Sequence, residues 1–433
     1  MTSKTGMNYG DPNATFVQAA GLLSLAQKRD GLINRLTAKL PSGTSDAMSK
    51  TKGQSGLHMP IMQTQDLGRG KGDQVEFHCM QPVNSFPIMG KDIAQGKGVG
   101  MSYVKDHVKV DQVRFPVDLG DMMSQIRTPY DLRAIGRPVA QSLMNRYMDQ
   151  APIVHLAGAR GFHTARGFNG WTIPTPDHPD FAKIAINRVK APTKNRHMMA
   201  AGNYVDMFGV NAGEIDITTD DILTMDVVDA IDSFMSQIEY PMPDVMFDGD
   251  TAAGDRPLKV LLCSDAQYNS FAKQEKFRSL QANALARASS ANNHPIFKVD
   301  AGLWSNTLII RNPIPIRFYK GDTIKYCASY DSETESSCVV PDSFGDNFAV
   351  DRAILLGGQA LVHAFGATGN GIPFFWNEEQ GDHKDKVELL IGAVMGYSKA
   401  RFELKDDQTG QTQFTDLGVT VIDTAVPIIG ARK

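Results

Sequence analysis

The sequence predicts an α+β fold that is organised around a long β-hairpin running into a long helix. Strand and helix patterns follow one another without the regular β-α-β alternation of a parallel α/β protein. An apolar content of 42% over 433 residues is ample for the cores of two or three domains. Residues 72–161 carry the clearest patterns, and we expect the rest of the chain to be arranged around them.

The hairpin is indicated by two segments in which polar and apolar residues alternate. Val75–Cys79 forms the first arm, and Met101–Leu119 forms the second. The alternation changes parity at Asp111-Gln112, as a β-bulge would cause. Residues 81–100 between the arms are rich in glycine and proline and contain Lys91 and Lys97. Because no core-forming pattern occurs there, we expect this tip to project from the body.

The helix follows directly after the hairpin. Thr128 is a candidate N-cap, Pro129 suits the first helical position, and Asp131 can satisfy free backbone amides. A helix from Thr128 to about Asp149 would be roughly 30 Å long, with a bend at Pro138. Its predicted apolar stripe consists of Leu132, Ile135, Val139, Leu143 and Tyr147.

The N-terminal segment predicts a tethered amphipathic helix. Apolar residues from Phe16 to Leu40, among them Leu22, Leu23 and Leu36, recur at helical spacing, and Ser42–Gly56 reads as a linker. Such a helix needs a partner for its apolar face. It can dock on its own domain or lie along a neighbouring subunit, and we favour the neighbour because of the family resemblance given below.

The remaining elements are predicted from local signals. Residues 162–220 show no period and are expected to be irregular, and Thr218–Asp221 is expected to cap a helix that carries Leu223, Val227, Ile231, Phe234 and Ile238. Leu258–Cys263 reads as a buried strand, with a capping box at Ser264–Gln267 opening the next helix. A further helical piece covers Phe277–Ala288. Strands are expected at Thr307–Arg311, Ile314–Phe318, Val387–Phe402 and Leu417–Ala425, whereas Ala353–Phe365 is buried as either strand or helix.

Motifs for catalysis are absent from the sequence. It contains no GxxxxGK[ST], HExxH, GxSxG or CxxC pattern. Gly366–Gly371 has the wrong glycine spacing for a phosphate loop, and the acidic residues of 378–385 match no calcium loop. Cys263 with a distant His155 or His363 could form a nucleophilic site, but each of the three lies among apolar neighbours. We therefore expect buried core residues, and neither a cofactor nor a metal.

Charge and targeting signals indicate which kinds of partner and which cellular location to expect for the protein. The net charge of −4 lacks the basic excess of a specialised nucleic-acid binder. Arginines 127, 133, 137 and 146 on the predicted helix could contact nucleic acid, but ion pairs on the helix surface or at a subunit boundary fit better. Four scattered cysteines, the absence of an apolar leader and the absence of an apolar run of spanning length predict an intracellular protein with no membrane contact.

Several short stretches resemble the major capsid proteins of N-four-like podophages. The resemblance is dense from about residue 70 to 161 and returns in patches to the end, but it leaves 162–220 unplaced. The stretches that carry it are Gly72–Val75, Gly96–Gly98, Met123–Gln125, Arg127–Arg133, Leu156–Gly161, Leu355–Ala360 and Asp416–Thr424.

The resemblance implies the Hong Kong 97-type capsid fold. Its parts would be an N-terminal arm at 1–70, an extended E-loop hairpin at 71–121, a P-domain with the spine helix at 122–165, rejoined by about 381–433, and an A-domain at 166–380. The protein would assemble with itself as pentamers and hexamers of an icosahedral shell. Further partners would be scaffold, portal and decoration proteins, and packaged double-stranded DNA bound without sequence specificity.

The expected subunit contacts lie in the hairpin tip and in the arm. They are Phe86, Ile88, Met89, Lys91 and Lys97 of the tip, with Phe16, Leu22 and Leu23 of the arm. We expect synthesis in the bacterial host cytoplasm and incorporation into the virion. The alternative is an oligomeric cytoplasmic enzyme with its site around Gly366–Asp385 and the hairpin as a dimerisation arm.

Overall fold

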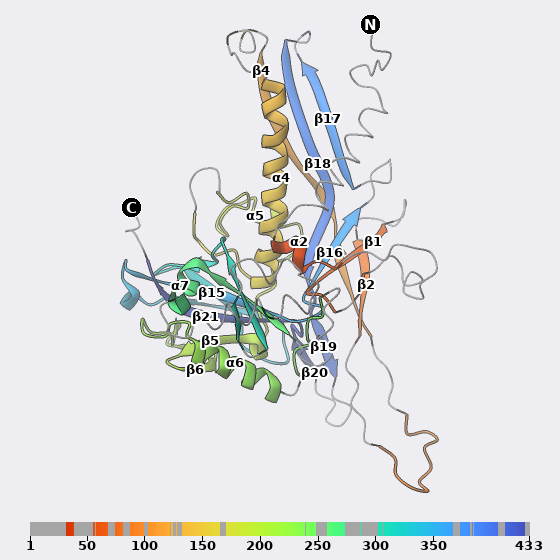
Figure 1. The fold of residues 1–433 in the computed structure, drawn as a ribbon, viewed down its shortest axis with the longest axis vertical. Coiled ribbons are helices and arrows are strands. Elements are labelled where there is room, and N and C mark those ends of the chain that lie inside the picture. The colour runs from red at the N-terminus through yellow and green to blue at the C-terminus, as the bar shows by residue number, and fades with distance from the viewer. Residues whose placement is uncertain are drawn as a thin grey trace.

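The structure is a computed structural model that is α+β and mostly sheet (Figure 1). It describes residues 32–38, 55–56, 58–67, 74–80, 87–98, 103–121, 123, 127, 132–164, 170–238, 240–247, 258–272, 286, 302–304, 306–366, 373–381, 383, 385–405 and 412–428.

The upper half of the molecule is a long sheet with one long helix on it (Figure 1). Strand β18 (Lys386–Lys399) lies between β4 (Asp111–Asp121) and β17 (Phe374–Gly381), and its second half pairs with β16 (Leu361–Gly366). Strand β1 (Ile61–Leu67) pairs in parallel with β16. Helix α4 (Leu132–Ala157) packs against β4 and β18, so this half is a two-layer structure.

The lower half is built on an eight-stranded mixed sheet. Its strands are, in sheet order, β10 (Gly302–Trp304), β11 (Thr307–Asn312), β9 (Lys259–Ser264), β15 (Phe348–Leu356), β21 (Val419–Pro427), β5 (His197–Ala201) and β6 (Tyr204–Met207), with β12 (Arg317–Phe318) beside β15. Helices α6 (Met225–Gln237) and α7 (Asp265–Ala272) share a hydrophobic cluster with one face of this sheet. The other face contributes to the main core.

Three small sheets complete the described structure. One contains β13 (Thr323–Cys327), β14 (Glu335–Val339), β8 (Glu214–Ile215) and β7 (Val210–Asn211); the others pair β19 (Phe402–Lys405) with β20 (Thr412–Thr415) and β2 (Gln74–Met80) with β3 (Tyr103–Lys109). The short helices are α2 (Leu32–Leu36), α5 (Phe181–Ala185), η2 (Lys194–Arg196) and η4 (Asp342–Phe344).

The hairpin arms are confirmed, and the change of parity has a clear structural origin. Strand β2 pairs with β3 in register from Gln74↔Lys109 to Met80↔Tyr103. After Val110 the chain changes partner, because β4 pairs with β18 instead of β2. The parity switch that we assigned to a bulge at Asp111-Gln112 therefore marks the point where the hairpin joins the long sheet.

Helix α4 continues farther than predicted, and part of its predicted apolar stripe faces away from the core. It runs through Pro152 to Ala157, whereas Thr128–Asp131 lie outside the described residues. Ile135 and Val139 are 49% and 46% exposed, so the predicted apolar stripe is wrong there. Tyr147 of the predicted stripe is buried as expected, and the other buried positions of the helix include Gly136, Ala140, Met144, Met148 and Ala151. Small residues face the sheet because the helix lies very close to it: a Cβ at Gly136 would come 2.2 Å from a methyl group of Leu119.

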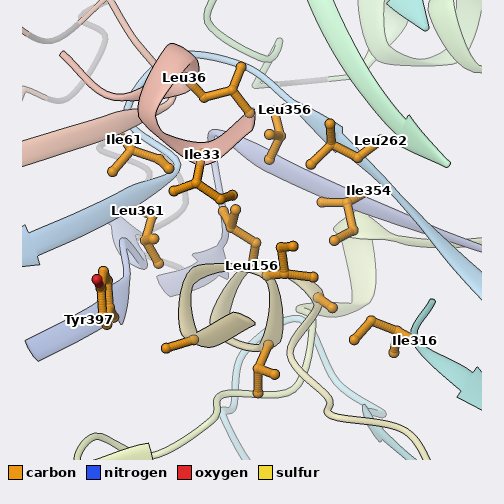
Figure 2. Close-up of a cluster of buried hydrophobic side chains, with 14 of the residues drawn as sticks. Ile33, Leu36, Ile61, Leu156, Leu262, Ile316, Ile354, Leu356, Leu361 and Tyr397 are labelled. Carbon is orange, nitrogen blue, oxygen red and sulfur yellow. The ribbon is translucent and has the colours of Figure 1, made fainter. Parts of the chain in front are cut away.

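The described part of the N-terminal segment belongs to the core of its own chain. Figure 2 shows Ile33 and Leu36 of α2 against Leu156 of α4, with Leu361 nearby. Leu36 is 0% exposed, and Thr37 forms a bridge with Ile61. The hypothesis that Leu36 is buried against a neighbouring subunit is therefore wrong. Residues 32–38 dock on the core of their own chain instead.

Three further predictions need correction. Asn195–Met199 falls in the stretch expected to be irregular, but β5 begins at His197 and is buried on both faces, so its sequence shows no alternation. The cap of α6 is Thr224, which accepts a hydrogen bond from the Val227 amide, rather than Thr218–Asp221. Ala353–Phe365 contains a turn between two strands, since β15 ends at Leu356 and β16 begins at Leu361.

Candidate subunit-contact surfaces

The tip of the hairpin lies far from the body of the chain (Figure 1). Residues Pro87–Gly98 are all exposed and form no helix or strand. Within this stretch the backbone hydrogen bonds are local, from Asp92 N to Met89 O at 3.4 Å and from Lys97 N to Ala94 O at 3.2 Å. Since this segment has no core of its own, its conformation is not fixed by the rest of the subunit.

Apolar side chains are concentrated on this tip. Met89 and Ile93 are each 73% exposed, and Ile88 is 39% exposed. Burying such a side chain is worth about 1.5–3 kcal/mol, so together they favour contact with another surface. Sequence reasoning selected Ile88 and Met89 but missed Ile93, which belongs to no apolar pattern. Phe86 lies outside the described residues, as do Phe16, Leu22 and Leu23 of the arm.

A second exposed apolar surface lies on the N-terminal half of α4. Its exposed positions are Ala134, Ile135, Pro138, Val139 and Ser142, none of which is charged. Of the arginines considered on this helix, Arg137 forms a 2.9 Å ion pair with Glu378 of β17 and lies over the ring of Trp376. That arginine is therefore engaged within its own subunit.

The region considered for an enzyme site does not gather catalytic groups in the described residues. Residues 367–372, 382 and 384 lie outside the described residues. Glu378 is turned toward α4, whereas Glu379 is exposed on the same strand. No group of three metal-ligating side chains occurs within the described ranges.

The candidate nucleophile and its histidines are buried. Burial raises the pKa of the Cys263 thiol to about 12, which keeps it protonated and unreactive. Burial lowers the pKa of His155 to about 4, and its Nε2 lies 3.2 Å from the carbonyl of Ala185. His363 stacks on Tyr397. All three occupy positions in the core, where a substrate has no access.

A small cavity also fails to supply a reactive set. It has a volume of about 260 Å³ and is lined by His163, Asp265, Ala266, Asn269, Pro313, Pro315, Arg317 and Pro427. Its guanidinium is committed to Asp351, with Nε at 2.6 Å from one carboxylate oxygen and Nη2 at 2.8 Å from the other. Desolvation is the main cause of the lowered pKa of His163, which favours its neutral form.

Comparison with known proteins decides the class of the chain. The family model described as phage capsid protein matches residues 6–428. The chain belongs to the phage capsid protein family. It is a structural component of the virion that forms the phage shell.

Solved structures with the same fold are also phage capsids. The capsid of Ralstonia phage GP4 is 22% identical, with a TM-score of 0.67 over 99% of this chain and 100% of that one. The capsid of cyanophage Pam1 is 12% identical, with a TM-score of 0.54 over 93% and 97%. The head structure of Helicobacter pylori bacteriophage KHP40 is 11% identical, with a TM-score of 0.50 over 85% and 87%. At these identities the likeness concerns the fold, and among curated proteins no sequence matches.

Buried ion pairs hold the two halves of the capsid protein together. Asp416, which precedes β21, forms an ion pair with Lys399 Nζ at 2.6 Å and accepts a hydrogen bond from Arg401 Nε at 2.7 Å. Lys399 is the last residue of β18, and Arg401 follows two residues later. These cations hold the pKa of the Asp416 carboxyl well below its usual range. Breaking such a pair leaves an uncompensated buried charge, so we expect this junction to be rigid in the subunit.

A second buried cluster pins the lower sheet to α4. Arg352 of β15 contacts both oxygens of Asp423 at 2.7 Å and donates to the carbonyl of Ala157 at 3.0 Å. His197 Nε2 lies 2.7 Å from the same carboxylate, and its ring stacks on Phe208.

Among the helices of the described segments, none is long and apolar enough to cross a membrane.

Proposed function

We propose that this capsid protein is the major coat subunit of a tailed phage, that it has the Hong Kong 97-type fold, and that it belongs with the N-four-like podophages. In this proposal, residues 1–70 contain the arm, 71–121 the E-loop, 122–165 with 381–433 the P-domain, and 166–380 the A-domain. The proposed shell is icosahedral and encloses double-stranded DNA, with scaffold, portal and decoration proteins as further partners. Synthesis takes place in the host cytoplasm.

The observation that carries the proposal is the exposed tip of the hairpin. Residues 87–98 project from the body and expose apolar side chains that the rest of the described chain does not cover. A rigid body with one adaptable projection suits a subunit that makes alike but non-equivalent contacts in pentamers and hexamers. The proposed contacts of Ile88, Met89, Lys91 and Lys97, and those of Phe86, Phe16, Leu22 and Leu23, serve this role.

The proposal also assigns the protein a purely structural role. The cysteine and histidines that were considered as catalytic residues are buried. The buried ion pairs of Asp416 with Lys399 and Arg401 join the two halves of the subunit. Self-association, rather than catalysis, would then be its activity. The near-neutral net charge of −4 is compatible with enclosing DNA without gripping it.

The test is assembly of the expressed chain, alone and together with the scaffold protein of its phage. Electron microscopy and sedimentation are expected to show closed shells, tubes or capsomers. A monodisperse monomer or dimer under every condition would contradict the proposal.

A further inference from the structure

Strand β17 lies at one edge of the long sheet and pairs with β18 alone (Figure 1). The carbonyl of Pro373 accepts from the Val394 amide at 2.9 Å, so these two residues form a hydrogen-bonded pair. In antiparallel strands the backbone groups of successive residues turn to alternate sides. Residues of odd number on β17 therefore bond to β18, whereas Phe374, Trp376 and Gln380 turn their backbone amides and carbonyls outward. None of these three backbone amides has a hydrogen-bond partner among the described residues.

The opposite edge of the same sheet, on β4, is closed by its own residues. The same alternation turns Gln112, Arg114 and Pro116 of β4 outward. Pro116 has no amide hydrogen, and the Gln112 amide donates to Oδ1 of Asp111 at 2.7 Å. The pairing of β4 with β18 also shifts register near the end of β4, and both prolines and such shifts discourage an edge from pairing with another strand. Strand β17 has neither feature, since its register with β18 is unbroken and it contains no proline.

An open edge of this kind is suited to accept one more strand. Because the edge on β4 is closed, two copies cannot join β17 of one sheet to β4 of the next. They can join β17 to β17 in antiparallel orientation, about a two-fold axis perpendicular to the sheet. Helix α4 packs on one face of the sheet, and such an axis leaves it on the same side in both copies. A closed shell requires this relation, because every subunit must turn the same face toward the inside.

The length of β17 limits the register of such a pairing. Outward-facing residues of one copy must lie opposite outward-facing residues of the other, so the axis passes through a residue. With the axis at Asn377, Phe374 lies opposite Gln380 of the other copy, and all of the strand except Gly381 is aligned. A shift of the axis toward Trp376 shortens the aligned stretch.

The charges of the strand favour the same register. With the axis at Asn377, Glu379 lies opposite Phe375 of the other copy. An axis at Glu378 or at Glu379 would place two identical carboxylates directly opposite, and like charges in that position destabilise a sheet. The charges of Lys386 and Glu388 belong to β18, one strand farther from the contact.

We propose that β17 of two copies pair antiparallel about a two-fold axis at Asn377, so that the long sheets of two subunits become one continuous sheet. This inference rests on the proposed function and adds to it a contact between copies that does not involve the hairpin tip. The contact is made by backbone hydrogen bonds of Phe374, Trp376 and Gln380, which the subunit itself does not use.

A disulfide placed on the axis tests the pairing. Directly opposite residues of a non-hydrogen-bonded antiparallel pair have Cα atoms about 4.5 Å apart, within the range of about 4.4–6.8 Å that a disulfide spans. Asn377→Cys is therefore expected to convert most of the protein in assembled particles into covalent dimers after treatment with oxidised glutathione, as seen on non-reducing gels. Glu379→Cys is the matched control on the same strand and face, because the two copies of this residue would lie roughly 13 Å apart along the strands. The wild type, in which Cys263, Cys327 and Cys338 are buried, should also give no dimers.

Proline substitutions test the outward backbone groups. Gln380→Pro removes an amide that does not bond to β18, so the melting temperature of the free subunit should change by less than about 2 °C. Its particle yield should fall at least about tenfold, because the intersubunit hydrogen bonds are lost. Glu379→Pro removes an amide that faces β18, and it should instead destabilise the free subunit itself.

The outcomes separate this contact from the proposed function. If wild-type particles form but those of Asn377→Cys give no dimers, or Glu379→Cys gives as many, the contact is refuted and the proposed function stands. The contact is also refuted if Gln380→Pro assembles as well as the wild type, or if it lowers the melting temperature of the free subunit as much as Glu379→Pro does. If the wild type forms no assembly under any condition, the proposed function fails and the contact fails with it.

Discussion

Replacing the exposed apolar residues of the tip should abolish assembly without unfolding the subunit. We consider Met89→Ser/Ile93→Ser, because each side chain is 73% exposed. Full burial of such a side chain is worth about 1.5–3 kcal/mol, and about three quarters of it is still available. The pair therefore forfeits roughly 2–4 kcal/mol per contact, which corresponds to a weakening of about 30-fold to 1000-fold.

The free subunit provides the first measurement. Since these side chains contact little in the isolated chain, its melting temperature should change by less than about 1 °C. Particle yield from sedimentation and electron microscopy provides the second measurement, and it should fall to background. Tyr204→Ser is the matched control, because Tyr204 is 75% exposed but lies on β6 in the lower sheet. Equal destabilisation of the free subunit, with particles forming normally, would show that the tip packs within its own chain.

Three further predictions follow from the described contacts. Removal of residues 1–31 should leave the melting temperature of the body nearly unchanged and should weaken the shells. Leu36→Ala should lower the free energy of unfolding of the subunit by about 2–5 kcal/mol in chemical denaturation, because Leu36 is fully buried. If the truncation destabilised the subunit as much as Leu36→Ala does, the arm would belong to the core. Thr224→Ala should lower the free energy of unfolding by about 1 kcal/mol, because the Val227 amide loses its acceptor, and Thr224→Ser should retain most of it. The free energy of unfolding of the subunit should fall as the pH drops from about 6.5 to about 4. The reason is that His155 and His197 are protonated near pH 6.5 in the unfolded chain, whereas burial lowers the pKa of both in the folded chain to about 4. A free energy of unfolding that stays constant across this pH range in urea titrations would contradict the assigned burial.

Elements with a complete local signal were predicted correctly. Strand β9 has a continuous apolar run, and the capping box at its end forms as expected: Ser264 N donates to Gln267 Oε1 at 2.8 Å, and Gln267 N donates to Ser264 Oγ at 3.3 Å. The hairpin arms β2 and β3 follow from alternation alone. In each case the interactions that define the element lie within a few residues or between adjacent strands.

Errors occurred where distant packing decides the outcome. The direction in which α4 faces depends on how closely it approaches the sheet, which favours Gly136 and Ala140 over the larger Ile135 and Val139 at the contact. Strand β5 has no visible period because both of its faces are buried. Leu36 carries the same helical spacing whether it meets its own core or a neighbour, so the sequence could not choose between the two.

The surface chemistry was predictable only in part. The tip was recognised because glycine, proline and lysine exclude it from a core. The open edge of β17 exists because this strand pairs with β18 on one side only. The order of strands in a sheet is a tertiary property, and no local pattern indicates it.

The most direct test of the account is a cryo-electron microscopy reconstruction of the particles formed by the expressed chain. The account predicts a closed shell in which residues 87–98 of each subunit are ordered against an adjacent copy. A shell in which the tip folds back on its own subunit would contradict the assigned role of the hairpin. A chain that never forms particles would contradict the proposal that it is the major coat subunit.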